Sequence, residues 1–215
     1  MSYVKSYSKA TNGKEYLSKN FQVKEFACND GTDFLQVDLE LIPIIQRFRE
    51  YVESPVSINS AYRTKSYNQK VGGASNSYHL YGRAFDVGFS SAYKYLTSVR
   101  AMCDFFNTLK VKGIIQYSWG CHIDTRDSTY HANSSGSLIN FGKVNIPLYC
   151  LLQKGSKSND VGVLQFMLKQ IGYNLLVDCD FGNNTLNAVK DFQRKNNLDD
   201  DGIVGNATWN KLIGR

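Results

Sequence analysis

The sequence predicts an α+β domain with a small antiparallel sheet, followed by a small domain of three short helices. The chain has 215 residues, enough for two modest domains that each have a core. Short apolar strand patterns and amphipathic helical patterns occupy the first part, whereas short helical patterns separated by glycine turns follow residue 150. We therefore place a first domain at 1–143, a linker at 144–149 around Pro147, and a second domain at 150–215.

The first domain is expected to combine two longer helices with several short strands. Apolar residues recur at helical spacing between Leu39 and Phe48, and again across Ala92–Leu109. Short apolar segments predict strands. These segments are Val56–Ile58, Arg83–Val87, Gly113–Tyr117 and Cys121–Asp124.

The second domain contains a short internal repeat that predicts turns leading into helices. Gly182-Asn-Asn-Thr and Gly205-Asn-Ala-Thr repeat the same turn pattern. Asn or Thr oxygens of these turns are expected to cap the helix that follows. Three apolar stripes along the segment predict three short helices that close on one core.

Composition and charge exclude several classes of protein. The net charge is +6, but the lysines are scattered and no arginine-rich stripe occurs, so nucleic acid is not the expected partner. An anionic polymer and a merely soluble basic surface both remain compatible with this charge. No run of eighteen apolar residues exists and the N-terminus has no secretory signal pattern, so neither membrane insertion nor ordinary secretion is expected.

The five cysteines are expected to be reduced and mostly buried, because their number is odd and none forms a Cys-x-x-Cys pair. This pattern argues against a disulfide scaffold and against a structural zinc site built on cysteine. Cys121 precedes His122 on a predicted strand, where neighbouring side chains point to opposite faces. Cys121 should therefore point away from any ligand site that contains His122.

Two histidines and one aspartate of the first domain have the chemistry of a metal site. His79, Asp86 and His122 offer two imidazole nitrogens and a carboxylate oxygen, and a catalytic zinc ion commonly has three protein ligands of these types. A continuous helix would separate His79 from Asp86 by about 10 Å along its axis. A turn at Gly82 that leads into a strand lets the chain fold back, and His122 is expected on a neighbouring strand. Taken singly, each residue has a structural explanation as well.

The residues around these three form motifs that resemble a known family of zinc peptidases. The motifs are Ser-x-Tyr-Arg ending at Arg63, Val-Gly-Gly-Ala starting at Val71, Ser-x-His-x-x-Gly-x-Ala-x-Asp starting at Ser77, and His-Ile-Asp starting at His122. From about Leu17 to Arg126, the chain resembles the zinc D-alanyl-D-alanine carboxypeptidase and L-alanyl-D-glutamate endopeptidase family, which shares its fold with the hedgehog signalling domain.

The resemblance implies a hedgehog-like zinc peptidase domain in residues 1–143. It implies that His79, Asp86 and His122 bind Zn²⁺, and that Arg63 stabilises substrate or developing negative charge. Many members place an acidic residue or histidine two or three residues before the last ligand, where this chain has Trp119 and Gly120.

This departure leaves the general base open. Asp124 follows His122 by two residues and therefore shares its strand face, which makes Asp124 the candidate base. The alternative is a carboxylate that orients His122. His131 is a weaker candidate for base or ligand and is expected in a surface loop.

The second domain resembles the peptidoglycan-binding domain found at the ends of bacterial and phage wall hydrolases. The matching segments run in order from Val161 to Trp209, although Cys179 stands where that family often has glycine. The resemblance implies peptidoglycan as the partner. The basic net charge is compatible with anionic wall polymers as a further partner. Which residues contact the wall is not readable from the sequence.

Together the two resemblances predict a metallopeptidase, a hydrolase that degrades the bacterial cell wall. Without a signal peptide it would be made in the bacterial cytoplasm and reach the wall through a holin-type pore, as a bacteriophage endolysin does during cell lysis. A D-alanyl-D-alanine carboxypeptidase, a bacterial autolysin or a spore-wall peptidase remains an alternative. So do a non-catalytic wall-binding protein with structural zinc and a sugar-cleaving hydrolase, although no carboxylate pair with a sugar-hydrolase pattern is apparent. The bond that is cut and the oligomeric state are not predicted.

Overall fold

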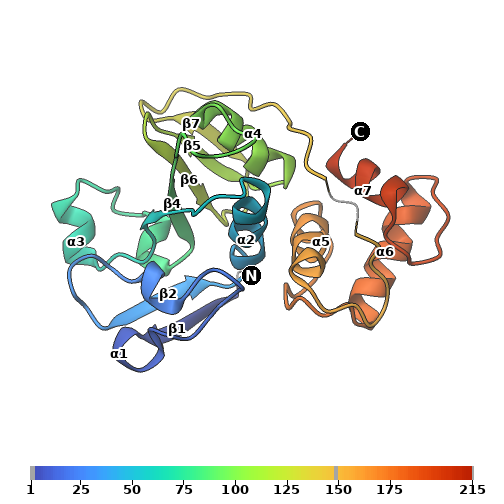
Figure 1. Cartoon of the computed structure of the whole chain (residues 1–215), viewed down its shortest axis with the longest axis horizontal. Coiled ribbons are helices and arrows are strands. Elements are labelled where there is room, and N and C mark those ends of the chain that lie inside the picture. The colour runs from blue at the N-terminus through green and yellow to red at the C-terminus, as the bar shows by residue number, and fades with distance from the viewer. Residues whose placement is uncertain (1–2, 148–149, 215) are drawn as a thin grey trace.

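The protein has two parts with different secondary structure (Figure 1). A computed structural model describes residues 3–147 and 150–214. The first part combines two sheets with helices, and the second contains three helices, so the predicted α+β class and the helical C-terminal part are confirmed. Residues 144–147 of the expected linker have no regular secondary structure, and residues 148 and 149 lie outside the described residues.

A five-stranded sheet forms the framework of the first part, in the order β3-β4-β6-β5-β7. Neighbouring strands are antiparallel, as expected, except that β7 pairs in parallel with β5 at the edge. The strands are β3 (Ile58–Ser60), β4 (Ala84–Gly88), β5 (Gly113–Gln116), β6 (Gly120–Asp124) and β7 (Tyr130–Asn133). The strand expected at 56–58 begins only at Ile58, and β7 was not predicted.

Helices α2 (Ile42–Tyr51) and α4 (Val99–Thr108) pack together beside this sheet. The ring of Phe48 on α2 lies 5.2 Å from that of Phe105 and 4.9 Å from that of Phe106, both on α4. The prediction of a helix over 92–109 was too long, because the Ser98 side chain accepts a hydrogen bond from the Ala101 amide and caps the helix there.

A second, two-stranded antiparallel sheet lies outside the main one, and the apolar pattern did not predict it. It consists of β1 (Val4–Ser8) and β2 (Phe34–Asp38). The remaining elements of this part are short helices. They are α1 (Lys9–Asn12), η1 (Val23–Phe26), α3 (Lys65–Lys70) and η2 (Tyr78–Tyr81).

The C-terminal part contains α5 (Asn159–Gln170), α6 (Asn183–Lys195) and α7 (Asn206–Ile213), as the three apolar stripes predicted. The predicted capping by Asn or Thr side chains is wrong. Gly182 and Gly205 are the N-cap residues of α6 and α7, and neither helix has a side-chain cap.

The threonines of this repeat instead accept a hydrogen bond from a glutamine of the preceding helix. Gln165 Nε2 donates to Thr185 Oγ1 at 3.0 Å, and Gln193 Nε2 donates to Thr208 Oγ1 at 3.2 Å. Both glutamines are buried, so their amides need partners inside the protein. The threonine oxygens are among the acceptors that satisfy that need. Each threonine is the third residue of its helix and not the N-cap residue.

The same repeat explains why glycine is common in the related family at the position of Cys179. Gln165 Oε1 accepts from the Cys179 amide, and Gln193 Oε1 accepts from the Gly202 amide in the second copy. Cys179 and Gly202 have φ angles of 62° and 78°, the left-handed conformation that glycine adopts readily.

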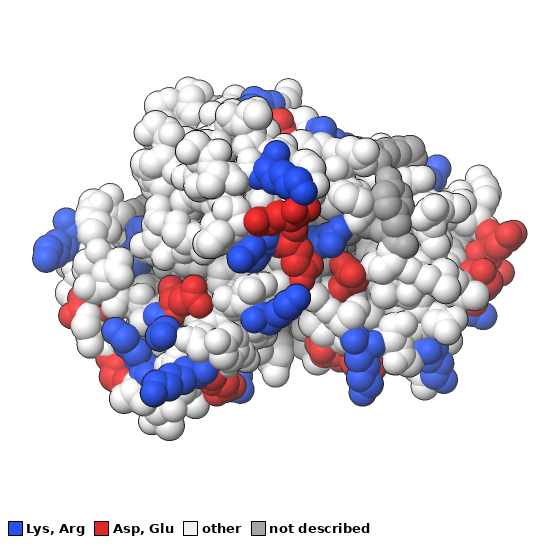
Figure 2. All heavy atoms as spheres, viewed as in Figure 1, with Lys and Arg blue, Asp and Glu red and all other residues white. Residues whose placement is uncertain are grey.

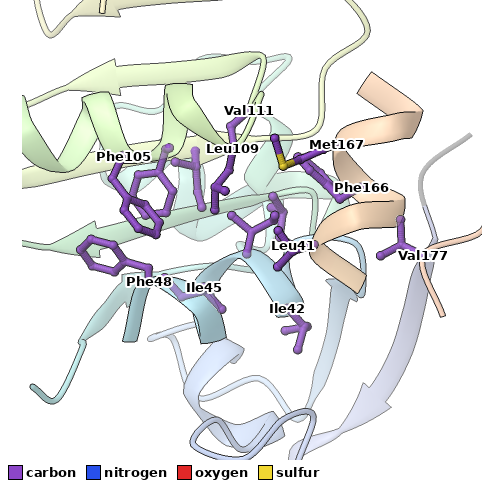
Figure 3. Close-up of a cluster of buried hydrophobic side chains, with 14 of the residues drawn as sticks. Leu41, Ile42, Ile45, Phe48, Phe105, Leu109, Val111, Phe166, Met167 and Val177 are labelled. Atoms are coloured by element: carbon purple, nitrogen blue, oxygen red, sulfur yellow. The ribbon is translucent and has the colours of Figure 1, made fainter. Parts of the chain in front are cut away.

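The two parts pack directly against each other through α2 and α5 (Figure 3). Leu41 lies on the side of Phe166 and Met167, and the buried apolar side chains of both parts form one continuous cluster. Gly162 of α5 lies so close to α2 that an added Cβ would be 2.8 Å from Pro43 Cβ.

Charged contacts border this apolar interface. Lys169 on α5 pairs with the buried Glu40, and Asn159 Nδ2 donates to the Pro43 carbonyl at 3.0 Å. The interface is therefore apolar at its centre and has polar links between the two parts.

We expect Gly162→Val to destabilise the protein by about 1–3 kcal/mol, the usual cost of overpacking a core. The new side chain would overlap Pro43 and the Cys179 sulfur. Denaturant unfolding measures this loss. Gly182→Ser is the control, because a Cβ at Gly182 meets no atom within 4 Å and serine suits this N-cap position. A loss as large in the control would contradict the packing explanation.

Charge is mixed on the face shown in Figure 2, where lysines and arginines alternate with acidic side chains. Among the described residues, no helix is long and apolar enough to cross a membrane.

Candidate metal centre

The three predicted ligand residues come together on one face of the five-stranded sheet. Asp86 lies on β4 and His122 on β6, and the two are direct cross-strand partners. His79 lies on η2, just before β4. Gly82 ends η2 with φ of 65°, and this turn directs the chain back into the strand, as the sequence predicted.

The inward-facing atoms of these residues form a nearly equilateral triangle. His122 Nδ1 is 2.9 Å from Asp86 Oδ1, His79 Nε2 is 3.2 Å from the same oxygen, and the two nitrogens are 3.1 Å apart. Ligand atoms about 2.0–2.1 Å from a tetrahedral zinc ion lie about 3.3 Å from one another. The three atoms therefore have the separation that a shared small cation requires, and all three residues are buried.

The outer nitrogen of each imidazole is held by an acceptor, which determines the tautomer. His79 Nδ1 lies 2.6 Å from the Ala61 carbonyl oxygen, and His122 Nε2 lies 3.0 Å from Asp124 Oδ2. Each outer nitrogen therefore carries the hydrogen, which leaves the inner lone pairs of both rings facing Asp86 Oδ1. Three acceptors that face one another in a buried site need a cation between them, either a metal ion or a proton.

The pKa values of the cluster reflect this need. Burial opposes ionisation of Asp86, but the two neighbouring imidazoles, above all protonated His122, outweigh it and lower the Asp86 pKa. Burial likewise disfavours charged His122, yet Asp124 and Asp86 outweigh it and raise the His122 pKa to about 9. The pKa of His79 is lowered, chiefly by burial. Without a metal, the cluster therefore holds its proton on His122.

The metal-free protein should consequently lose stability as pH rises. The His122 pKa lies above its ordinary value of 6.5, so proton binding stabilises the fold fully below pH 6.5, and this stabilisation disappears as pH passes about 9. We expect the thermal midpoint of chelator-treated protein to be lower at pH 9.5 than at pH 6.5. The same comparison for His122→Gln should show a much smaller decrease, and an equal one would contradict this assignment.

Arg63 supports Asp86 from the side of β3. Its Nη2 lies 2.5 Å from Asp86 Oδ2 and its Nε donates to Ser60 Oγ at 2.7 Å. The Arg63 amide also donates to the His79 carbonyl at 3.0 Å. Arg63 thus holds the carboxylate at the oxygen that does not face the histidines.

Asp124 lies behind His122 rather than at the open side of the cluster. Its Oδ2 accepts from His122 Nε2, and Arg126 donates to both of its oxygens, at 2.8 Å and 2.5 Å. Asp124 is fully buried, and these bonds lower its pKa to about 2 although burial opposes the shift. Because its oxygens are occupied and face away from the inner lone pairs, the geometry does not fit the predicted role of general base.

His131 and Cys121 lie on the opposite face of the sheet. His131 is in β7, not in a surface loop as predicted, and it pairs with the buried Ile114. Its Nε2 contacts the Val111 carbonyl at 3.1 Å, so it contributes neither a ligand nor a base. Cys121 is buried in the core, as expected from strand alternation. All five cysteines are free, and three of them are buried, as predicted.

Sequence reasoning missed Arg126 and Ala61. Arg126 follows Asp124 by two residues, a spacing that places both on one side of an extended chain and was readable from the sequence. The contact between His79 and the Ala61 carbonyl joins a side chain to a backbone group eighteen residues away. No sequence pattern predicts this contact.

Comparisons with known proteins match both parts of the chain. Residues 15–124 match the model of the family described as Peptidase M15, and residues 157–212 match that of a putative peptidoglycan binding domain. A segment of 39 residues is 46% identical to the zinc D-Ala-D-Ala carboxypeptidase of Streptomyces albus G. That segment covers 18% of this chain and only 15% of the relative.

Solved structures resemble shorter parts of the chain. A peptidoglycan-binding protein from Clostridioides difficile, in complex with glutamine hydroxamate, is 45% identical over 30% of this chain and 41% of its own, with a TM-score of 0.30. The Burkholderia AP3 phage endolysin is 38% identical over 31% of this chain and 25% of its own, also with a TM-score of 0.30.

The Peptidase M15 match spans about half of the chain and includes the whole of the ligand cluster. It also agrees with the extent of the resemblance read from the motifs, which ran from about Leu17 to Arg126. The chain therefore belongs to the Peptidase M15 family.

Proposed function

We propose that this protein is a zinc-dependent peptidase that hydrolyses a peptide bond in the stem peptide or cross-link of bacterial peptidoglycan. The observation that carries this proposal is the buried triangle of His79, Asp86 and His122, whose three lone pairs require a cation. Family membership supports peptide hydrolysis, and the match of the C-terminal part to a peptidoglycan-binding domain supports the wall as substrate.

The donor set fits Zn²⁺, which accepts two imidazole nitrogens and one carboxylate oxygen. A zinc ion held there supplies a Lewis acid that polarises a carbonyl group and makes water nucleophilic near neutral pH. His79 and His122 present their inner nitrogens because Ala61 and Asp124 hold the outer ones. Asp86 presents Oδ1 because Arg63 engages its other oxygen.

Arg63 and Asp124 have different roles in this proposal. The side chain of Arg63 remains 15% exposed, so its guanidinium can also meet a carboxylate or a developing negative charge of the substrate. Asp124 is a positioning residue held by Arg126. It keeps the His122 ring oriented and makes the inner nitrogen of that ring a stronger electron-pair donor to a metal ion.

We further propose that the protein acts in lysis as an endolysin of the bacteriophage type. This rests on the pairing of a peptidase with a wall-binding module in one chain. The packing of α2 against α5 holds the two modules together, so binding at the wall also brings the metal centre to it. The net charge of +6 favours binding to anionic wall polymers as well.

Mass spectrometry of fragments released from purified peptidoglycan tests this function. We expect peptides with a newly exposed amine and intact disaccharides, loss of these products with a chelator, and their return when zinc is added. The His79→Ala protein serves as the matched inactive control. Binding to the wall without any cleavage would favour a non-catalytic protein with structural zinc, and cuts between sugars would identify a glycan hydrolase; either result overturns the proposal.

A further inference from the structure

Tyr117 lies on the same face of the sheet as the metal-binding cluster. It follows β5, and its amide bonds with the Gly120 carbonyl at 2.9 Å in the turn that leads into β6. Ile115 is the cross-strand partner of His122, and side chains two residues apart along a strand share a face. Tyr117 is therefore the diagonal neighbour of His122, a separation that an aromatic side chain can bridge.

The ring of Tyr117 is held, but its hydroxyl is not engaged. The ring stacks on that of Trp119, with centroids 5.0 Å apart and planes inclined by 10°. Tyr117 is half-buried, and no residue in the described ranges 3–147 and 150–214 forms a hydrogen bond with its hydroxyl. A stacked ring that carries an unengaged hydroxyl beside the metal-binding cluster can donate a hydrogen bond to a molecule that enters the site.

The charged groups of the cluster shift the pKa of this hydroxyl. Burial raises the pKa of Tyr117, the Asp86 carboxylate raises it further, and Arg63 acts in the opposite direction. The hydroxyl therefore keeps its hydrogen at neutral pH, so it suits donation rather than proton abstraction. It lies near the guanidinium that the preceding proposal assigns to the negative charge of the substrate.

We propose that the Tyr117 hydroxyl is a catalytic donor that hydrogen-bonds the oxygen of the scissile carbonyl as negative charge develops on it, together with Arg63. This inference rests on the proposed peptidase function. When water adds to the carbonyl carbon, the electron pair of the double bond moves to the oxygen, and donors that already point at that oxygen stabilise it without reorganising. Trp119 positions the tyrosine ring for this contact.

The test is Tyr117→Phe, which keeps the ring and its stacking on Trp119 but removes the hydroxyl. The matched control is Tyr51→Phe, which removes the same group from a half-buried tyrosine on α2. We expect kcat on a soluble stem peptide to fall about 100-fold in Tyr117→Phe, with KM, zinc content and thermal midpoint unchanged. A phosphinate analogue of the cleaved bond, measured by calorimetry, should bind more weakly by a similar factor.

The possible outcomes distinguish failure of this inference from failure of the proposed peptidase function. A wild-type protein that cleaves no wall peptide overturns both. A Tyr117→Phe protein that matches wild type in kcat and phosphinate affinity overturns only the role of Tyr117. A change in KM alone also overturns it, because a contact that binds substrate and transition state equally is not a donor to developing charge.

Discussion

Replacing His122 by alanine is expected to abolish both zinc binding and peptide hydrolysis. His122 supplies one corner of the ligand triangle, and the remaining pair, His79 and Asp86, would leave a buried carboxylate facing a single imidazole. Zinc affinity should fall by more than about 100-fold, which exceeds the usual cost of losing a hydrogen bond that merely supports a ligand. Equilibrium dialysis with zinc analysis and a peptidoglycan digestion assay measure the two effects.

His131→Ala is the natural control, because His131 is the third histidine of the chain and lies on the other face of the sheet. It should retain zinc and activity once the fold is verified by circular dichroism. Stoichiometric zinc and full turnover in the His122→Ala protein would refute the ligand assignment. Loss of zinc in His131→Ala at an intact fold would show that the metal centre lies elsewhere.

Asp124→Asn is expected to weaken zinc binding while leaving the chemistry available. Asparagine can still accept one hydrogen bond from His122, but it lacks the negative charge that polarises the ring and balances Arg126. Zinc affinity should fall about 10- to 100-fold, as is typical when such a supporting partner is changed. Activity should fall in dilute zinc and recover as zinc is raised to saturation.

The recovery distinguishes positioning from proton transfer. If Asp124 were the general base, turnover would stay low at saturating zinc, and that result would restore the interpretation suggested by sequence alone. Asp127→Asn is the matched control, since it removes the same charge from a nearby exposed carboxylate. It should behave as wild type at every zinc concentration.

The residues of the candidate metal centre were predictable because local sequence carries enough information about them. The residue types match the donor preferences of zinc, and Gly82 marks the turn that brings His79 back toward Asp86. Strand alternation then places Cys121 away from the site and Asp124 on the side of His122. These features depend on a few consecutive residues, so they are readable without knowing the fold.

The roles of the residues around the candidate metal centre could not be predicted in the same way. Asp124 was predicted as the general base, and only the structure shows that Arg126 and His122 occupy its oxygens. His131 seemed a spare ligand until the parallel pairing of β7 with β5 placed it on the opposite face. Both observations depend on which strands pair and in what register. The separation of two residues along the chain does not reveal that pairing.

The C-terminal part shows the same division. Its three helices followed from apolar periodicity, but the partners of Thr185 and Thr208 did not, because Gln165 and Gln193 become buried only when the helices pack. The sequence by itself thus determined the longer helices, four strands of the main sheet, the family and the types of candidate ligand, since these depend on short-range pattern and side-chain chemistry. Only the tertiary structure decided which polar groups meet, because burial and strand register arise from contacts between residues that are distant along the chain.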